Sequence, residues 1–311
     1  MSSCTEATFT LTGIDGQQLC AYSWLPEGTP RAAVMIAHGM AEHVLRYRRF
    51  AAALTGGGYA VYGLDLRGHG QTGAQHGALG HFADEGGFSL VVSDLGVLRD
   101  EVSRRHPGVA VSLFAHSMGS MFGQDYIVRE GRHLAGVVMS GAPAGHGPKS
   151  RAGEAFAKVE RARVGRQQVS ELLHRTAMAD PGKKFRPGRT DCDWLSRDEA
   201  EVDAYVADPL CGFALTTQSW VDVMLGLQRV EALDYQAAIP RGLPIYLVAG
   251  TADPIAREGA ATHWLENRLK EVGLTDVTVQ LYPDGRHEML NEVNRELVHA
   301  DLLSFFDRVS A

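Results

Sequence analysis

Ser117 has the surroundings of a nucleophile. It lies in Ala115-His-Ser-Met-Gly119, where an apolar run leads directly into a small-x-Ser-x-Gly turn that is followed by a segment of helical period. Such a turn strains the serine backbone, so it needs small residues two positions on either side, and it leaves the hydroxyl group exposed. Backbone N–H groups at the start of the following helix can stabilise the oxyanion that forms when an acyl carbon is attacked. The pattern predicts a nucleophilic serine at the carboxyl end of a strand.

A serine nucleophile needs a base and an acid that orients the base, and after this type of turn the acid precedes the histidine in the chain. Asp253 and His287 occur in this order, each just past the end of a predicted strand. We expect His287 to take the proton from Ser117 and to pass it to the leaving group, while Asp253 holds the imidazole tautomer. Alone, Asp253 could be a turn residue before a proline, and His287 a solvated loop histidine. Their joint occurrence with the serine turn favours a catalytic triad.

The stretch His38-Gly-Met-Ala-Glu-His43 follows another predicted strand and is a candidate oxyanion loop, because Gly39 lets the backbone approach a ligand closely. We assign the two oxyanion donors to the backbone N–H groups of Met40 and Met118. The residues that we expect to shape this loop and the site are His38, Gly39, Glu42, His43 and His116. No third ligand at a recognisable spacing accompanies the histidines, so we expect no metal site. The sequence also lacks a phosphate-loop motif and a dinucleotide fingerprint, and we expect no cofactor.

A mostly parallel sheet with helices on both faces would place these residues at one edge. Two early runs, Ala7–Thr12 and Leu19–Trp24, are joined by the turn signal Asp15-Gly16 and predict a hairpin. Six later apolar runs, most of them nearly continuous, are typical of strands that are covered on both sides. These runs are Ala33–Ala37, Ala60–Leu64, Val109–Ala115, Ala135–Met139, Ile245–Val248 and Val277–Leu281. Eight strands result, and the longer segments of helical period between them complete an α/β architecture.

Two segments have the periodicity of helices that pack on a sheet. In each segment the apolar residues recur every three or four positions, so they form one stripe along a helix. The first stripe consists of Val91, Leu95, Leu98 and Val102, and the second of Val298, Leu302, Phe305 and Val309. From residue 145 to 238 the strand rhythm disappears, and the sequence becomes helix-like, rich in charge and interrupted by prolines. We therefore expect an α/β core formed by residues 1–144 and 239–311, and a helical cap formed by residues 145–238.

The charge of the expected cap is polarised along the chain. Residues 145–190 hold eleven Lys or Arg and four Asp or Glu, whereas residues 191–210 hold one Arg and seven acids. One interpretation is that two exposed charged faces pair with each other, as charge runs usually do. The alternative is an interfacial patch whose basic half brings the protein to anionic lipid.

Composition excludes several classes of protein. The 311 residues are 45% apolar and 22% charged, which is typical of a folded globular protein rather than a disordered or fibrous one. The net charge of −7 lacks the positive field that nucleic-acid binding usually needs. Four widely spaced cysteines form no C-x-x-C pair, which favours a reducing compartment without zinc or disulfides. Because no signal peptide or apolar run of about 18 residues is evident, we expect a soluble cytoplasmic protein, and peripheral contact with a membrane remains an alternative.

Five blocks of the sequence, in their order, resemble the monoacylglycerol lipase and lysophospholipase group of α/β hydrolases, which is often labelled serine aminopeptidase-like. The blocks are His38–His43 followed by Arg46-Tyr47, then Asp65–Gly70, His116–Gly119, Asp253-Pro254 and Gly285–Glu292. The segment Asp208–Phe213 resembles part of the cap of bacterial members. The resemblance implies the α/β-hydrolase fold with a mobile inserted helical cap, and it implies the same triad and oxyanion donors. Two positions depart from the group's pattern, Ala115 and Ser120, where glycine is usual; neither removes a catalytic group.

The expected activity is hydrolysis of carboxylic esters, most specifically monoacylglycerols or related single-chain acyl esters, through an acyl-enzyme on Ser117. General short-chain carboxylesterase and lysophospholipase activities remain alternatives, followed by an aminopeptidase and a non-catalytic binding protein that keeps the fold. Ser117 argues against dehalogenases and epoxide hydrolases, which would carry an acidic nucleophile at this turn. The expected partner is a small acyl ester.

Overall fold

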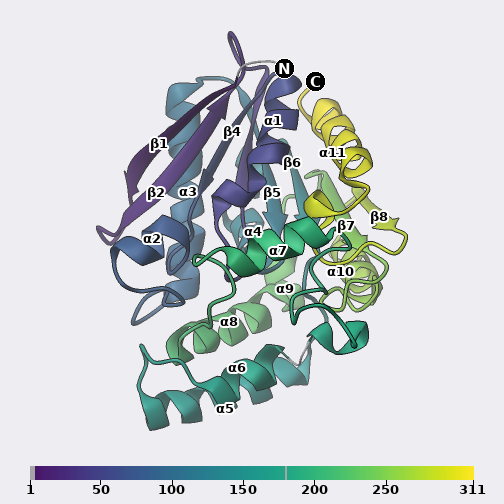
Figure 1. The fold of residues 1–311 in the computed structure, drawn as a ribbon. Helices are drawn as coiled ribbons and strands as arrows, with labels where there is room; N and C mark the ends of the chain where they lie inside the picture. The colour runs from purple at the N-terminus through teal and green to yellow at the C-terminus, as the bar shows by residue number, and fades with distance from the viewer. Residues whose placement is uncertain (1–3, 179–180) are drawn as a thin grey trace.

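The computed structural model describes residues 4–178 and 181–311 and contains an eight-stranded sheet in the order β1-β2-β4-β3-β5-β6-β7-β8 (Figure 1). The strands are β1 (Thr5–Thr12), β2 (Gln18–Leu25), β3 (Ala32–Ala37), β4 (Tyr59–Leu64), β5 (Ala110–His116), β6 (Gly136–Ser140), β7 (Ile245–Gly250) and β8 (Val277–Tyr282). All eight strands that the sequence predicts are therefore present, with similar boundaries.

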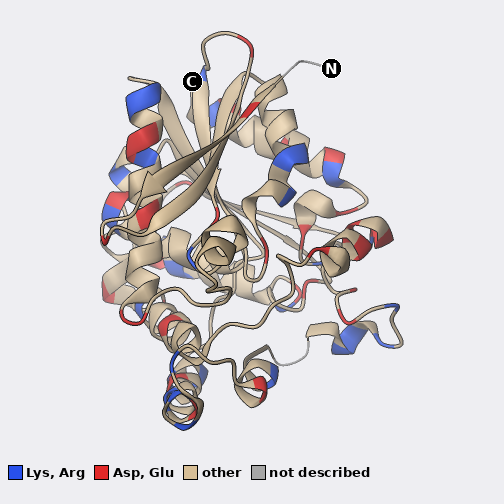
Figure 2. Ribbon diagram, turned by 60° about the vertical axis from the view of Figure 1, so that its left-hand side comes forward, with Lys and Arg blue, Asp and Glu red and all other residues tan. Residues whose placement is uncertain are grey.

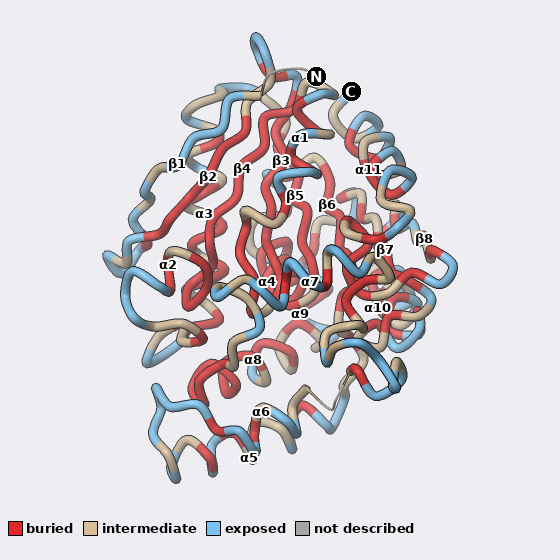
Figure 3. The backbone as a smooth tube through the Cα atoms, in the orientation of Figure 1, coloured by how far each residue is buried: buried red, intermediate tan, exposed pale blue. Residues whose placement is uncertain are grey.

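The sheet is mostly parallel, as expected. Strand β2 is antiparallel to both β1 and β4, and every other neighbouring pair is parallel. The hairpin between β1 and β2 turns at Gly16, whose φ of +87° suits glycine. Edge strand β1 is largely exposed, whereas β3 and β4 are buried along their whole length (Figure 3). The apolar runs of the central strands follow from this burial, because both of their faces are covered.

Two hydrophobic cores lie on opposite faces of the sheet. Along β3, Ala33 and Met35 belong to one core, and Val34 and Ile36 belong to the other. This alternation is what the period of two in a strand requires. Residues of α3, α4 and α10 pack in the first core, and residues of α1 and α11 pack in the second.

The helices of the sheet layers are α1 (Arg48–Gly56), α2 (Gly70–Gln75), α3 (Gly87–Arg105), α4 (Met118–Glu130), α10 (Ala260–Glu271) and α11 (Arg295–Val309). The apolar stripe that the sequence predicts for α3 is fully buried. In α11, Val298, Leu302 and Phe305 are buried, and Val309 is half-buried.

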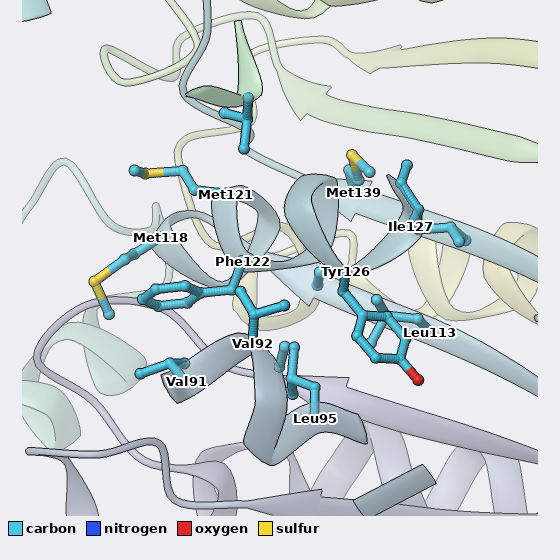
Figure 4. Packing of buried hydrophobic residues seen from close by; sticks show 14 of the residues in the cluster. Val91, Val92, Leu95, Leu113, Met118, Met121, Phe122, Tyr126, Ile127 and Met139 are labelled. Atoms are coloured by element: carbon cyan, nitrogen blue, oxygen red, sulfur yellow. The ribbon is translucent and has the colours of Figure 1, made fainter. Parts of the chain in front are cut away.

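Helix α4 packs against α3 at the centre of the first core. Figure 4 shows Phe122 and Tyr126 of α4 facing Val91, Val92 and Leu95 of α3. All five side chains are buried. This contact fixes the helix that begins directly after Ser117, so it positions the proposed nucleophile through the backbone.

Between β6 and β7 the described residues form helices and loops without a named strand. The helices are α5 (Pro148–Val164), α6 (Glu171–Met178), α7 (Glu199–Ala207), α8 (Thr217–Val230) and α9 (Leu233–Gln236). Figure 1 places α5, α6 and α8 below the sheet, with α5 alongside α8. Within residues 4–178 and 181–311, no helix combines the length and apolar composition that a membrane span requires.

Helix α8 is attached to the sheet layer by a buried carboxylate. Asp125 of α4 accepts hydrogen bonds from Arg229 of α8 and from Arg129, which lies one turn further along α4. The Arg229 guanidinium also lies 3.3 Å from the Ser89 hydroxyl of α3. The Asp125 side chain has no solvent exposure, so the two arginines compensate a charge that would be costly alone.

The polarised charges of the helical segment pair both within and between its two halves. Arg189 contacts Asp203 at 2.6 Å and Glu199 at 3.3 Å, as the pairing interpretation expects. In contrast, Lys158 and Arg163 pair within α5, with Glu154 and Glu160 respectively. Figure 2 accordingly shows both signs of charge on the helices below the sheet.

Candidate active site

Ser117 lies in the sharp turn between β5 and α4 that the sequence predicts. Its backbone has φ +51° and ψ −121°, which is strained for a residue with a side chain. A Cβ atom at Gly119 would lie 2.3 Å from the Ala37 carbonyl oxygen, so only glycine allows this close approach. Ala115, where the resembling group usually has glycine, is fully buried, and its methyl group lies beside Gly123. The core therefore accommodates the additional methyl group.

His287 and Asp253 meet Ser117 at the carboxyl edge of the sheet. The Ser117 hydroxyl lies 2.9 Å from Nε2 of His287, and Nδ1 of the same ring lies 2.9 Å from Oδ2 of Asp253. Asp253 is fully buried, and its other oxygen accepts a hydrogen bond of 2.8 Å from the Ile255 backbone N–H. One carboxylate oxygen is thus used to hold the loop, and the other faces the imidazole.

The electrostatics of this site suit a histidine that must become charged. Burial disfavours the imidazolium, but the Asp253 carboxylate outweighs this effect, with help from Glu288 and Glu42, and the pKa of His287 is raised. The His287 side chain is only 3% exposed, so these interactions act with little screening by water. The arrangement can accept a proton from Ser117 and stabilise the ion pair that results.

The predicted oxyanion donors line the same cavity as Ser117. Met40 follows Gly39, and a Cβ atom on Gly39 would lie 3.3 Å from the Ser117 Cβ, so the loop backbone passes close to the serine. Met118 is the first residue of α4. The first N–H groups of a helix have no acceptor inside the helix and are free to bind an anion.

A buried ionic network connects the oxyanion loop with the loop that carries His287. One oxygen of Glu42 accepts a hydrogen bond of 2.6 Å from the Gly39 N–H, and the other accepts one of 2.7 Å from Arg46. The Arg46 guanidinium also binds both oxygens of Glu288, at 2.6 and 2.7 Å. Burial alone would raise the pKa of Glu42, but Arg46 holds it below its usual value. The network therefore holds both loops through charge-assisted bonds.

Sequence reasoning placed Glu42 in the site but missed the roles of Arg46 and Glu288. Both residues occur within the motifs that support the family resemblance, and Glu288 directly follows His287. The occurrence of charged residues inside these motifs is the signal that could have assigned Arg46 and Glu288 to the site. Their pairing could not be read from spacing, because 242 positions separate them.

His38 and His116 are buried next to the site and contact the backbone of neighbouring loops and strands. Nε2 of His38 accepts a hydrogen bond of 3.0 Å from the Leu66 backbone N–H, and Nδ1 lies 2.8 Å from the Gly39 carbonyl oxygen. His116 Nδ1 lies 3.2 Å from the Ser140 carbonyl oxygen. Burial lowers the pKa of His38 well below the ordinary value and that of His116 to about 4, with nearby histidines adding to the effect. Both rings are therefore neutral at pH 7.

The far side of the oxyanion loop contacts the helical segment. His43 Nε2 lies 2.8 Å from Oδ2 of Asp208, which follows α7. The Ala41 carbonyl oxygen accepts hydrogen bonds from the Tyr205 hydroxyl, at 3.0 Å, and from the Gly212 N–H, at 2.9 Å. The sequence predicted that His43 shapes the loop; its partner comes from a segment about 165 positions away.

A cavity of about 700 Å³ opens beside Ser117. Its lining includes apolar side chains from α4, α6 and α8, namely Met118, Met121, Ala177, Met178, Val223, Met224 and Leu227. Polar side chains such as Glu171, His174 and Arg175 also reach it. An apolar cavity of this size beside a nucleophile can hold a single flexible acyl chain.

The mostly parallel sheet, the strained serine turn and the histidine and aspartate that meet it define a protein of the α/β-hydrolase fold. Residues 28–294 match the family model described as serine aminopeptidase, S33, and the chain belongs to this family. The fold and the family that the sequence motifs indicated are thereby confirmed.

Related proteins of similar length are known. The chain is 30% identical over 305 residues to the monoacylglycerol lipase of Mycolicibacterium smegmatis, with 98% of each chain covered. It is 28% identical over 294 residues to the monoglyceride lipase of Homo sapiens, covering 93% of this chain and 87% of the relative. Among solved structures, a thermostable carboxyl esterase from Bacillus coagulans superposes with a TM-score of 0.92 at 25% identity, covering 99% of this chain and 100% of the esterase.

Proposed function

We propose that this protein hydrolyses carboxylic esters of single acyl chains, most specifically monoacylglycerols, through an acyl-enzyme on Ser117. The observation that carries the proposal is the unbroken relay of two 2.9 Å contacts from Ser117 through His287 to Asp253. The names of the relatives, lipases of monoacylglycerols and an esterase, support the ester class and the substrate.

The proposed reaction has two halves. In the first, the Ser117 oxygen attacks the acyl carbon while its proton passes to Nε2 of His287. The N–H groups of Met40 and Met118 stabilise the tetrahedral oxyanion, and collapse expels the alcohol with the proton from the imidazolium. In the second half, His287 takes a proton from the water molecule that attacks the acyl-enzyme. Collapse of the second tetrahedral intermediate releases the acid and returns this proton to the Ser117 oxygen.

The substrate's acyl chain would occupy the apolar part of the cavity. Because α6 and α8 form one wall of this cavity, residues 145–238 would act as a cap that covers the bound chain. Water would thereby be excluded from the acyl group, which strengthens the electrostatic interactions at the reacting carbon. The anchoring of α8 by Asp125 and Arg229 indicates that α8 is the fixed part of this cap.

The proposal is tested with Ser117→Ala and a fluorophosphonate probe. The wild-type protein should be labelled at Ser117, and Ser117→Ala should lose labelling together with ester hydrolysis, by about 10⁴ or more in turnover. Ser304→Ala changes an exposed serine on α11 and should behave as wild type. Retention of hydrolysis by Ser117→Ala, or labelling at another residue, would contradict the mechanism.

The substrate class is tested by comparing kcat/KM across chemical series. Monoacylglycerols of increasing chain length should be better substrates than short nitrophenyl esters, lysophospholipids or aminoacyl-naphthylamides. Preference for short nitrophenyl esters would indicate a general esterase, and cleavage of the amides would indicate a peptidase. A complete absence of turnover on all series would favour a binding protein.

We further propose a peripheral contact between the outer side of α5 and α6 and anionic lipid. Three apolar side chains of this region are exposed, Val159, Leu172 and Val169, at 63%, 57% and 47%. Exposed basic residues lie in α5, namely Lys149, Arg151, Lys158 and Arg163, of which Lys158 and Arg163 also pair with Glu154 and Glu160. Sedimentation with anionic and neutral vesicles at low salt tests this contact, and equal partitioning into both would contradict it.

A further inference from the structure

We propose that His43, Asp208 and Cys211 form a binding site for a divalent transition metal of the Zn²⁺ type, separate from the ester-hydrolysing centre. The three residues come from two segments, the oxyanion loop and the segment after α7. Within the described ranges 4–178 and 181–311, this is the one group of three His, Cys, Asp or Glu residues whose ligand atoms come together. The proposal does not depend on the substrate of the enzyme.

The ligand atoms are close to the spacing that a metal ion requires. All three lie within 4.8 Å of one another, and His43 Nε2 lies 2.8 Å from Oδ2 of Asp208. Tetrahedral zinc, with bonds of about 2.0 Å to nitrogen and 2.3 Å to sulfur, separates its ligand atoms by roughly 3.3–3.8 Å. Side-chain movements of about 1.5 Å or less would reach this spacing.

The local backbone holds two of the ligands in position. The Asp208 carbonyl oxygen accepts a hydrogen bond of 3.0 Å from the Cys211 N–H, and this turn brings the two side chains together. Asp208 Oδ1 accepts a hydrogen bond of 2.8 Å from the Leu210 N–H, which orients the carboxylate. The other oxygen, Oδ2, is left for His43 or for a metal ion. Such outer hydrogen bonds are what ligating carboxylates usually have.

The ligand types match a borderline-soft cation. Imidazole, thiolate and carboxylate are all zinc ligands, and three protein ligands leave a fourth position for water. Mg²⁺ and Ca²⁺ prefer oxygen ligands and would not gain from the thiol. Binding would release the thiol proton to the solvent, because the metal binds the thiolate. His43 would ligate through an unprotonated Nε2, so the proton that Nε2 shares with Asp208 would be released and the neutral ring would carry its proton on Nδ1.

The electrostatic surroundings favour a cation at this position. Burial raises the pKa of the Cys211 thiol, so its thiolate would form only as a metal replaces the proton. The charged groups around the thiol are the carboxylates of Glu42, Asp208 and Glu288 and one guanidinium, that of Arg46. The Asp208 side chain is 31% exposed, so an ion can enter from solvent, whereas His43 is buried. The site is therefore open on one side and net negative.

A bound metal would join the cap segment to the oxyanion loop. Hydrogen bonds to the Ala41 carbonyl oxygen already connect the same two segments. Coordination would add strong bonds between these two segments. The ligand on the oxyanion loop, His43, lies three residues after the proposed oxyanion donor Met40. The metal would thus stabilise the closed contact between cap and loop.

The experiment measures metal binding to the full chain with Zn²⁺ and Co²⁺. Titration with Co²⁺ should produce a thiolate-to-cobalt charge-transfer band that saturates at one equivalent, and Zn²⁺ should displace it. Cys211→Ser should abolish the band, and Asp208→Asn and His43→Gln should each weaken Zn²⁺ binding tenfold or more. Zn²⁺ should also raise the Tm of the wild-type protein but not of Cys211→Ser.

Two control variants separate this site from other metal sites. Cys4→Ser removes a cysteine near the N-terminus and should keep both the band and the Tm increase. His287→Ala abolishes the proposed hydrolysis and should also keep them, so a failure of one proposal is distinguishable from a failure of the other. A band that persists in Cys211→Ser, Zn²⁺ binding that is lost in His287→Ala, or no saturable binding would overturn the proposal.

Discussion

At the scale of single residues, the site depends on buried charged side chains that are paired with side chains of opposite charge. His287 is paired with Asp253, and Glu42 and Glu288 share Arg46. A buried charge that loses its partner is strongly unfavourable, so each of these groups constrains the position of the next. The strained serine is held by the same rigid surroundings rather than by its own conformational preference.

The raised pKa of His287 predicts a pH dependence. Catalysis needs the neutral imidazole, so kcat/KM falls as the pH decreases through the pKa of this group. Because that pKa is raised, the acidic limb lies at a higher pH than it would for an ordinary histidine. Asp253→Asn removes the charge that raises the pKa, so the limb should move to lower pH, while kcat falls by about 10⁴.

The measurement is a pH profile of kcat/KM with a soluble nitrophenyl ester. Asp276→Asn is the control, since this carboxylate pairs with Arg308 at the surface and should leave the limb in place. An acidic limb that does not move in Asp253→Asn would show that another group controls it.

At the scale of elements, the contact between α8 and α3 determines where α8 lies relative to the sheet layer. Gly226 of α8 packs directly on Phe88 of α3, and a Cβ atom there would lie 2.1 Å from the Phe88 ring. Arg229 reinforces this contact from the next turn of α8. The close packing is available only because the residue at the crossing has no side chain.

Gly226→Ala is therefore expected to destabilise the protein. The gain in helix propensity, about 1 kcal/mol, is smaller than the cost of displacing the Phe88 ring and α8, roughly 1–3 kcal/mol. Gly96→Ala is a matched control in α3, because nothing lies within 4 Å of the added Cβ. Gly96→Ala should instead increase the free energy of unfolding, because alanine has the higher helix propensity. Urea unfolding of both variants measures the difference, and equal midpoints would contradict the close packing.

At the scale of the whole molecule, the cavity exists only between the sheet layer and the inserted helices. Ser117 and Met121 lie at the start of α4 in the sheet layer, whereas Val223, Met224 and Leu227 belong to α8. Chain-length preference is therefore a property of the assembled fold rather than of either part. The ion pairs that connect these parts, including Arg229 with Asp125, hold the cavity to its shape.

Met224→Trp should shorten the acyl chains that the protein accepts. Met224 lines the cavity, is half-buried and packs against the first core, so a larger side chain there takes up cavity volume. We expect kcat/KM for long-chain monoacylglycerols to fall at least tenfold and that for a nitrophenyl acetate to stay nearly unchanged. Leu225→Trp adds the same volume at a neighbouring exposed position and should have no such effect. A parallel loss on both substrates would contradict the assigned role of the cavity.

Much of the fold and of the site was predictable because its signals are local. Strands follow from apolar runs, the hairpin from Asp15-Gly16, and the nucleophile from small residues around Ser117. Chain order then selected Asp253 and His287, since parallel strands bring their carboxyl ends to one edge. These features depend on residues within a few positions of one another, or on a rule of topology.

Only the tertiary structure decided which distant groups meet. Segments that are far apart in the chain meet in three places. Arg46 binds Glu288, Asp208 and Cys211 lie close to His43, and residues of several helices and loops together line the cavity. Such contacts follow from how the inserted helices pack, and no periodicity or turn signal encodes that packing. The sequence by itself determined which catalytic side chains lie at the edge of the sheet. Tertiary packing determined the charged groups around them, the cavity proposed for the substrate and the candidate metal ligands.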